Sequence, residues 1–180
     1  MDEKRGLKIV FYISIIAIIL FAYLINVHYK PSQSRFCDIS EDISCDIVNK
    51  SLYSEIFGIP VSVLGALTFL AVLWLSWMLL RKHATKSEFL SHSNLLKMIL
   101  VIAVVSTIFS LWLIYAELYL ILSICLLCVV ADVLILAMLY VSLQLNKRKI
   151  NKQLYWSGVS LFVIVSIIVL YLVYRIVIEL

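Results

Sequence analysis

Long apolar runs separated by short polar stretches dominate this chain. Five of them are long enough to cross a hydrocarbon core of ~30 Å, which needs about 20 apolar residues in a helix. They cover residues 9–27, 59–80, 95–115, 118–145 and 154–174. Because unpaired backbone groups cost several kcal/mol in lipid, each run is predicted to be a helix. The first run is too long for a secretory signal peptide, and no small-residue cleavage site precedes Pro31, so it is predicted to be an uncleaved span.

The composition also indicates a membrane protein. The 180 residues are 64% hydrophobic and 14% charged, whereas a soluble domain is about 45–50% apolar. The net charge of +4 does not indicate a nucleic-acid partner, because the basic residues form short clusters at the ends of the apolar runs. We therefore predict an all-α integral membrane protein in which residues 1–180 form one domain.

The basic residues are distributed unevenly between the two sides of these spans. Cytoplasmic segments carry an excess of Lys and Arg. One side holds eleven of the fifteen: Lys4, Arg5, Lys8, Arg81, Lys82, Lys86, Lys97, Lys147, Arg148, Lys149 and Lys152. The N-terminus is therefore predicted to be cytoplasmic, and the C-terminus extracytoplasmic. The loop 28–58 and a short turn near Glu117 are also predicted to face outside.

Four cysteines form two pairs on this predicted outer side. Cys37 and Cys45 lie in the polar loop, and Cys125 and Cys128 form a Cys-Leu-Leu-Cys in the fourth apolar run. A two-residue gap within a helix brings two sulfurs close enough for a disulfide. Cys125 is predicted to lie on the order of 10 Å below the outer surface, at ~1.5 Å per helical residue. The two pairs predict a relay, in which the loop pair exchanges with a soluble thiol protein and then with the pair at membrane depth.

Each pair also has a structural interpretation. A loop pair often staples a flexible loop, and small residues in a helix ease helix packing. A zinc site from all four cysteines would need ligands from both the loop and membrane depth, with only His28 nearby outside, so no metal site is predicted. The alternative class of function is a non-catalytic membrane scaffold with static disulfides.

The outer loop contains a helical pattern before the second span. The apolar residues recurring at helical spacing are Leu52, Tyr53, Ile56 and Phe57. Ser51 is a candidate N-cap, and Gly58 a C-terminal stop. We predict a short amphipathic surface helix over residues 52–57 that covers the end of the bundle and shields a pocket.

The ordered motifs over residues 10–145 resemble the prokaryotic form of the vitamin K epoxide reductase family. The carriers are Cys37, SCDIVNKS at 44–51, YSEIFGIP at 53–60, Leu64-Gly65 and the Cys-Leu-Leu-Cys at 125–128. The resemblance implies a four-helix bundle around a quinone site plus a fifth transmembrane helix. It also implies a thioredoxin-like (DsbA-like) protein as electron donor and a quinone as electron acceptor.

The resemblance further implies roles for the cysteines. Cys37 corresponds to the cysteine that exchanges with the thioredoxin-like partner, and Cys45 to the one that passes electrons to Cys125. Cys128 corresponds to the cysteine that faces the quinone. Many bacterial members carry a fused thioredoxin-like domain after the fifth helix, whereas this chain stops at Leu180. The partner is therefore expected to be a separate extracytoplasmic protein.

Four further residues are expected at the quinone site. Ser51 matches a loop hydroxyl of that site, Ser54 falls where vertebrate enzymes have a quinone-contacting asparagine, and Phe57 belongs to the cap. Asp132 stands where vertebrate enzymes have a tyrosine near the quinone, so ubiquinone or menaquinone is expected rather than a vitamin K epoxide. An acid within a span is a functional hypothesis by default, here proton transfer during quinone reduction. The alternative is a structural pair with Ser106, Thr107 or Ser110 on a neighbouring helix.

The sequence therefore predicts a membrane thiol oxidoreductase of a prokaryotic cell membrane. It would reoxidise its thioredoxin-like partner and pass two electrons through both cysteine pairs to a quinone, supporting disulfide-bond formation outside the cytoplasm. An alternative within enzymes is a quinone or vitamin K (epoxide) reductase whose main product is the reduced quinone.

Overall fold

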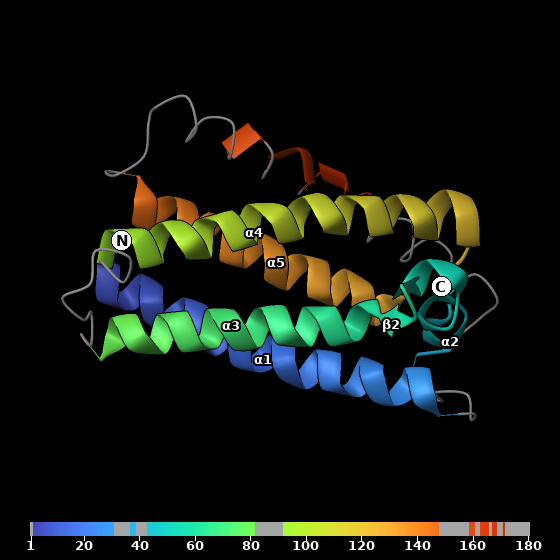
Figure 1. Ribbon diagram of the computed structural model, residues 1–180. Helices are drawn as coiled ribbons and strands as arrows, with labels where there is room; N and C mark the ends of the chain where they lie inside the picture. The colour runs from blue at the N-terminus through green and yellow to red at the C-terminus, as the bar shows by residue number, and fades with distance from the viewer. Residues whose placement is uncertain are drawn as a thin grey trace.

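Four long helices form most of the structure, a computed structural model that describes residues 2–30, 37–38, 43–81, 92–147, 159–160, 163–165, 167–168 and 171. The helices are α1 Glu3–Tyr29, α3 Val61–Leu80, α4 His92–Tyr115 and α5 Leu126–Asn146. They run lengthwise through the molecule (Figure 1). All four are long and apolar enough to cross a membrane, α4 together with its continuation to Ile121. The predicted all-α membrane class is confirmed.

The expected fifth span, residues 154–174, lies largely outside the described residues. Those of its residues that are described are helical. Val165 is fully buried in an apolar cluster with Ile114 of α4 and Val129 of α5. The described part of this segment therefore packs against α4 and α5.

Close packing of apolar side chains holds the four helices together. Helix α1 packs against α3 and α5, and α4 packs against α5. The Phe21 and Phe69 rings of α1 and α3 lie 5.7 Å apart between centroids. A β-carbon added at Gly65 of α3 would come within 2.5 Å of the Phe21 ring, so glycine permits this close contact. Such packing matters because lipid provides no hydrophobic drive for helix association.

The chain between α1 and α3 folds over one end of the bundle (Figure 1). Helix α1 ends at Tyr29 because the next residue, Lys30, precedes a proline and adopts an extended conformation (φ −86°, ψ 138°). The described part of the loop contains helix α2 Cys45–Asn49, the short 3₁₀ helix η1 Leu52–Ser54, and strands β1 Glu55–Ile56 and β2 Ile59–Pro60. This end of the bundle therefore carries the loop cysteines and the N-terminus of α3.

The short helix of the loop lies earlier than the sequence pattern indicated. Residues 52–57 do not form one helix, because β1 and β2 pair as an antiparallel hairpin. Phe57 and Gly58 occupy its turn with φ of 52° and 77°. Two consecutive positive φ values are typical of a tight hairpin turn and end any helix. The apolar spacing in this segment therefore belongs to a 3₁₀ turn followed by a hairpin.

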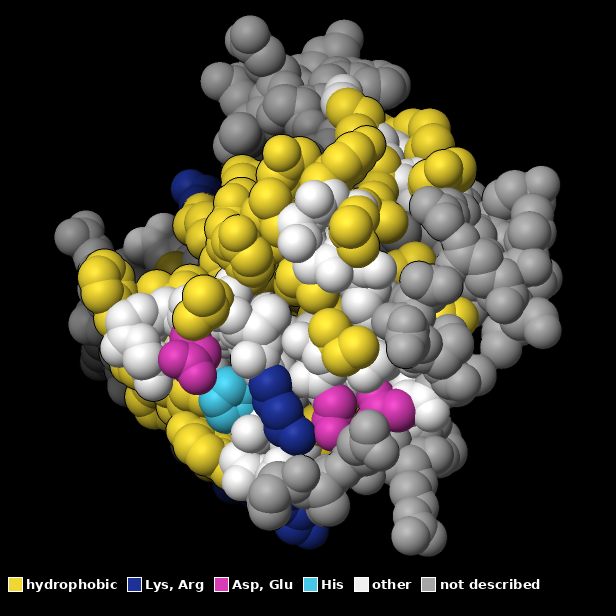
Figure 2. All heavy atoms as spheres, turned by 90° about the vertical axis from the view of Figure 1, so that its right-hand side faces the viewer, with side chains coloured by type: hydrophobic (Ala, Val, Ile, Leu, Met, Phe, Trp, Pro, Cys, Tyr) yellow, Lys and Arg dark blue, Asp and Glu magenta, His cyan; other side chains and the backbone are white. Residues whose placement is uncertain are grey.

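Polar contacts fasten the hairpin and α2 to the end of α1. The His28 ring lies 2.6 Å from the Asn49 carbonyl through Nδ1 and 3.2 Å from Glu55 through Nε2. Lys50 forms an ion pair with Asp46 at 3.2 Å. Figure 2 views this end and shows a band of charged and histidine side chains beside a hydrophobic area. The His28 contacts hold α2 and the hairpin against α1, and the Lys50–Asp46 pair lies within the loop.

The connection between α4 and α5 also differs from the prediction. A turn near Glu117 was expected, with the fourth span starting at residue 118. Instead, α4 continues as the π-helical segment η3 Ala116–Ile121, and the chain turns at Leu122, whose φ is 58°. Glu117 is buried rather than exposed at a turn. The fourth span therefore starts at Leu126.

Candidate redox site

Backbone pairing joins the outer loop to the α4–α5 connection. Ile43 and Ile124 form a parallel β-bridge. The Ser44 N–H donates to the Ile124 carbonyl with an N···O distance of 3.2 Å. Because Cys45 and Cys125 follow directly in the sequence, this pairing brings the two cysteine pairs together.

The loop pair is a buried disulfide at the start of α2. Cys37 and Cys45 are bonded with a Cα–Cα distance of 5.5 Å, and neither is exposed to solvent. Ser44 caps α2 by accepting from the Ile47 N–H at 3.2 Å, and it donates to Asp38 at 2.5 Å. Both cysteines of the pair that is predicted to exchange with a soluble thiol protein are therefore buried in the oxidised state.

The second pair lies at the N-terminus of α5. Cys125 is the N-cap, and its sulfur accepts a hydrogen bond from the Cys128 N–H at 3.2 Å. Both are free thiols, with Cys125 buried and Cys128 partly exposed. The backbone at the start of α5 therefore directs an N–H at the Cys125 sulfur. Cys125 was expected about two turns inside a helix, and it instead begins one.

Three of the four sulfurs lie close together where the two cysteine pairs meet. The Sγ atoms of Cys45 and Cys125 lie 3.3 Å apart. The Sγ atoms of Cys37, Cys45 and Cys125 all lie within 4.8 Å of one another. Thiol–disulfide exchange proceeds by direct attack of a thiolate on a disulfide sulfur. The contact between Cys45 and Cys125 is therefore the one that exchange requires. The sulfurs of Cys37 and Cys45 are bonded to each other and so are not free to bind a metal.

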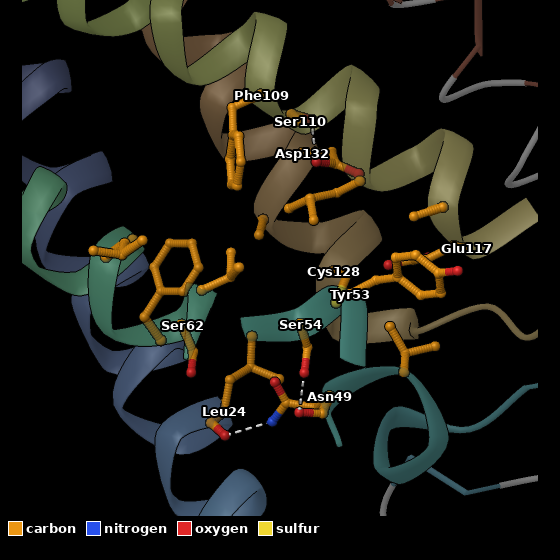
Figure 3. A pocket seen from close by; sticks show the side chains of 18 of the residues that line it. Leu24, Asn49, Tyr53, Ser54, Ser62, Phe109, Ser110, Glu117, Cys128 and Asp132 are labelled. Carbon is orange, nitrogen blue, oxygen red and sulfur yellow. Dashed lines mark hydrogen bonds between the residues drawn. The ribbon is translucent and has the colours of Figure 1, made fainter. Parts of the chain in front are cut away.

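A mostly apolar cavity lies inside the bundle beside Cys128 (Figure 3). It holds about 960 Å³ of empty space, counted out to its open side. Side chains from α1, the outer loop, η3 and helices α3, α4 and α5 line it, including Phe21, Phe69, Phe109 and Ile135. Among the cysteines, all four of which are described, Cys128 lines this cavity and the other three do not. An apolar cavity with a few polar groups is typical of a small-molecule site.

Three of the four expected quinone-site residues line this cavity. Ser51, Ser54 and Asp132 do so. The Ser51 hydroxyl donates to the Val48 carbonyl at 2.8 Å. Phe57 does not line the cavity, because it stands fully exposed at the hairpin turn.

Asp132 has a partner on the neighbouring helix. Its carboxylate accepts a hydrogen bond from the Ser110 hydroxyl of α4, and both residues are buried (Figure 3). Ser110 was one of three candidate partners, so the expected pairing with a neighbouring helix is confirmed there. Because both residues also line the cavity, this contact does not test a role in proton transfer.

Two further cavity residues were not anticipated as site residues. Glu117 is buried, and its Oε2 accepts a hydrogen bond from the Cys125 N–H at 3.3 Å. Its signal in the sequence is an acid within an apolar stretch, the same signal that singled out Asp132. Ser62 is buried, and its hydroxyl has no hydrogen-bond partner in the described part of the chain. A hydroxyl in an apolar span is too common to give a comparable signal.

The fold and the site define an integral membrane protein in which two cysteine pairs meet at one end of a helix bundle, beside an apolar cavity. The chain belongs to the vitamin K epoxide reductase family, because residues 8–143 match the sequence model of that family. It is therefore a membrane oxidoreductase, and the resemblance seen in its motifs is confirmed. Among curated proteins, none gives a significant match to this chain.

Proposed function

We propose that this protein is a quinone-dependent thiol–disulfide oxidoreductase. It reoxidises a thioredoxin-like protein outside the cytoplasm and so supports disulfide-bond formation there. Two electrons pass from the partner to Cys37 and Cys45, then to Cys125 and Cys128, and finally to a quinone. The protein lies in a prokaryotic cell membrane with its N-terminus in the cytoplasm.

The observation that carries this proposal is the 3.3 Å contact between the sulfurs of Cys45 and Cys125. Two disulfides that only held a loop and a helix in place would not need to have their sulfurs in contact with each other. Here a free thiol at a helix N-terminus lies against the sulfur of a disulfide from a distant part of the sequence. This arrangement supports exchange between the pairs over two static staples.

The cavity fits a quinone headgroup as the final acceptor. A quinone bound there supplies a two-electron, two-proton acceptor. Cys128 lines the cavity and is the sulfur available to it, while Cys125 faces the loop pair. The polar groups that line the cavity and can hold a proton or form a hydrogen bond include Asp132 and the hydroxyls of Ser54 and Ser62. Ubiquinone or menaquinone is the proposed acceptor.

The wild type and one variant, Cys128→Ala, test the proposal as purified proteins in detergent. Reduced thioredoxin serves as donor, and the reduction of ubiquinone-1 or menadione is followed by absorbance. The wild type is expected to reduce at least one of them, and Cys128→Ala to reduce neither. As a matched control, Cys128→Ala still carries the Cys37–Cys45 disulfide, and its reduction by thioredoxin shows that the entry step persists. A wild type with no activity, and cysteines that never change redox state, would support the scaffold alternative.

A second assay separates the proposed role from recycling of a reduced quinone. The gene for this protein is expressed in a bacterium that lacks its own enzyme for reoxidising the periplasmic thiol oxidase. Restored disulfide formation in secreted proteins is expected. Quinone reduction in vitro without restoration in cells would favour the quinone reductase alternative.

A further inference from the structure

Glu117 is a buried acid next to the cysteines that the proposed relay leaves unused. It lies on η3, where α4 continues towards the α5 N-terminus, and only 5% of it is exposed. A π-helical segment shifts the side chains that follow it relative to an α-helix, and such segments are frequent at functional sites. Glu117 therefore faces inward at the point where the two centres meet.

The contacts of Glu117 are with the cysteines themselves. Its Oε2 accepts from the Cys125 N–H at 3.3 Å, and its carboxyl interacts with the Cys128 side chain. It also lines the cavity together with Cys128 (Figure 3). A buried carboxyl is costly unless it is paired. Its pairing with these groups links it to the step in which the disulfide of α5 opens and closes.

We propose that Glu117 positions Cys125 and supplies the proton that Cys128 takes up when the Cys125–Cys128 disulfide opens. This inference rests on the proposed function, because it concerns the exchange between the two pairs. The acceptor oxygen of Glu117 fixes the backbone of Cys125 opposite Cys45. Its carboxylic acid form lies beside the sulfur that becomes the leaving group.

The step is balanced within the protein and water. The Cys45 thiolate, which has lost its proton to water, attacks the Cys125 sulfur; the Cys45–Cys125 bond forms and the Cys125–Cys128 bond breaks. The electron pair leaves on Cys128, which takes the proton from Glu117, and the carboxylate regains a proton from water. Cys37 then loses its proton to water, and its thiolate attacks Cys45 and releases Cys125 as a thiolate, which the Cys128 N–H stabilises at 3.2 Å. Two electrons have moved from the loop pair to the α5 pair.

The test measures exchange without quinone. Quinone-free protein with both pairs oxidised is mixed with reduced thioredoxin, and free Cys128 is tagged with a maleimide after acid quenching. Dithiothreitol replaces thioredoxin if thioredoxin does not react. The rate seen in a Cys45→Ser variant is subtracted, which leaves the part that passes through the loop pair. Because no quinone is present, failure of quinone reduction in the other assay does not affect this measurement.

Glu117→Gln is the central variant, since an amide oxygen still accepts from the Cys125 N–H but the group carries no transferable proton. We expect exchange to slow by about a hundredfold, as for loss of a general acid. Glu117→Ala is expected to slow exchange at least as much, and added acetate is expected to restore part of its rate. Glu3→Gln is the matched control, since it removes a carboxylate at the far end of α1, and its rate is expected to equal that of the wild type.

The remaining outcomes overturn the inference in part or whole. If Glu117→Gln exchanges at the wild-type rate and Glu117→Ala exchanges slowly, Glu117 positions Cys125 but does not supply the proton. Wild-type rates in both variants would remove Glu117 from the mechanism. If Glu117→Gln does not fold, Glu117→Asp takes its place, because it keeps a transferable proton on a shorter side chain. The proposal then requires that the exchange rate of Glu117→Asp be higher than that of Glu117→Ala measured without acetate. Equal exchange rates in these two variants would contradict it.

Discussion

The sulfur of Cys45 lies 3.3 Å from that of Cys125 while Cys45 is still bonded to Cys37. A disulfide bond is about 2.05 Å long, so little movement separates this contact from a bond. The Ile43–Ile124 bridge and the Ser44 cap of α2 hold the two backbones on either side of it. Exchange between the centres therefore requires no large movement of the described part of the loop.

This contact predicts an efficient crosslink. In a Cys37→Ser/Cys128→Ser variant, Cys45 and Cys125 are the remaining cysteines. We expect them to form a disulfide under mild oxidation, because their sulfurs already touch. Mass spectrometry of non-reduced peptides measures the yield.

A matched variant tests whether Cys45 is the specific partner. Cys45→Ser/Cys128→Ser leaves Cys37 and Cys125, whose sulfurs lie within 4.8 Å. Its crosslink is expected to form more slowly, because Cys45 is the loop cysteine whose sulfur lies 3.3 Å from that of Cys125. Equal rates in the two variants would argue against a defined order within the loop pair.

The spans are predictable from sequence because lipid leaves the backbone little choice. The runs at residues 9–27 and 59–80 correspond to α1 Glu3–Tyr29 and α3 Val61–Leu80. Helix α1 begins six residues before its run, and the other ends agree within two residues. Any long apolar segment in a bilayer must satisfy its own amides, and a helix does so. The two cysteine pairs were predictable for a different reason, because few other side chains carry out thiol–disulfide chemistry.

The connections are less predictable because they depend on contacts between distant residues. Hydropathy indicates a break at Glu117, yet the acid is buried and hydrogen-bonded to the Cys125 backbone. The parallel bridge of Ile43 with Ile124 has no sequence signal, although it brings the two centres together. Phe57 was expected over the cavity, and the positive φ at the hairpin turn instead leaves it exposed. The first two differences arise from tertiary contacts that a local pattern does not contain, whereas the third arises from the hairpin formed by β1 and β2.

Gly65→Ala is expected to reduce the space inside the cavity. The new methyl group would lie 2.5 Å from the Phe21 ring, which lines the cavity and can swing into it. Such overpacking costs about 1–3 kcal/mol. We expect a lower melting temperature in detergent and a higher KM for quinone. Adding Phe21→Leu is expected to reverse both changes, and a double variant no better than Gly65→Ala would contradict this cause.

Asp132→Asn separates the two roles of this acid. If the carboxyl transfers a proton, quinone reduction slows while expression and melting temperature are retained, because the amide oxygen still accepts from Ser110. Ser110→Ala is the structural counterpart. It leaves the Asp132 carboxylate without this donor, which costs about 1–3 kcal/mol, and it is expected to lower the melting temperature. An unchanged quinone rate in Asp132→Asn would remove the proton role and leave the helix contact.

Ser62→Ala is expected to raise stability and weaken quinone binding. Ser62 is 4% exposed and lines the cavity, and its buried hydroxyl has no hydrogen-bond partner in the described part of the chain. An unpaired buried polar group costs about 1–3 kcal/mol. Its removal should therefore raise the melting temperature. If the hydroxyl donates to a quinone oxygen, the same change raises the KM for quinone.

Thr68→Val is the matched control for Ser62→Ala, which is expected to raise stability but weaken quinone binding. The Thr68 hydroxyl lines the same cavity, but it already donates to the Leu64 carbonyl at 2.8 Å. Because valine has nearly the same shape and the hydroxyl is engaged, the KM for quinone is expected to stay near that of the wild type. Equal KM changes in Ser62→Ala and Thr68→Val would point to cavity shape instead of a hydrogen bond. A higher melting temperature for Ser62→Ala with an unchanged KM would show that the unpaired hydroxyl does not contact the quinone.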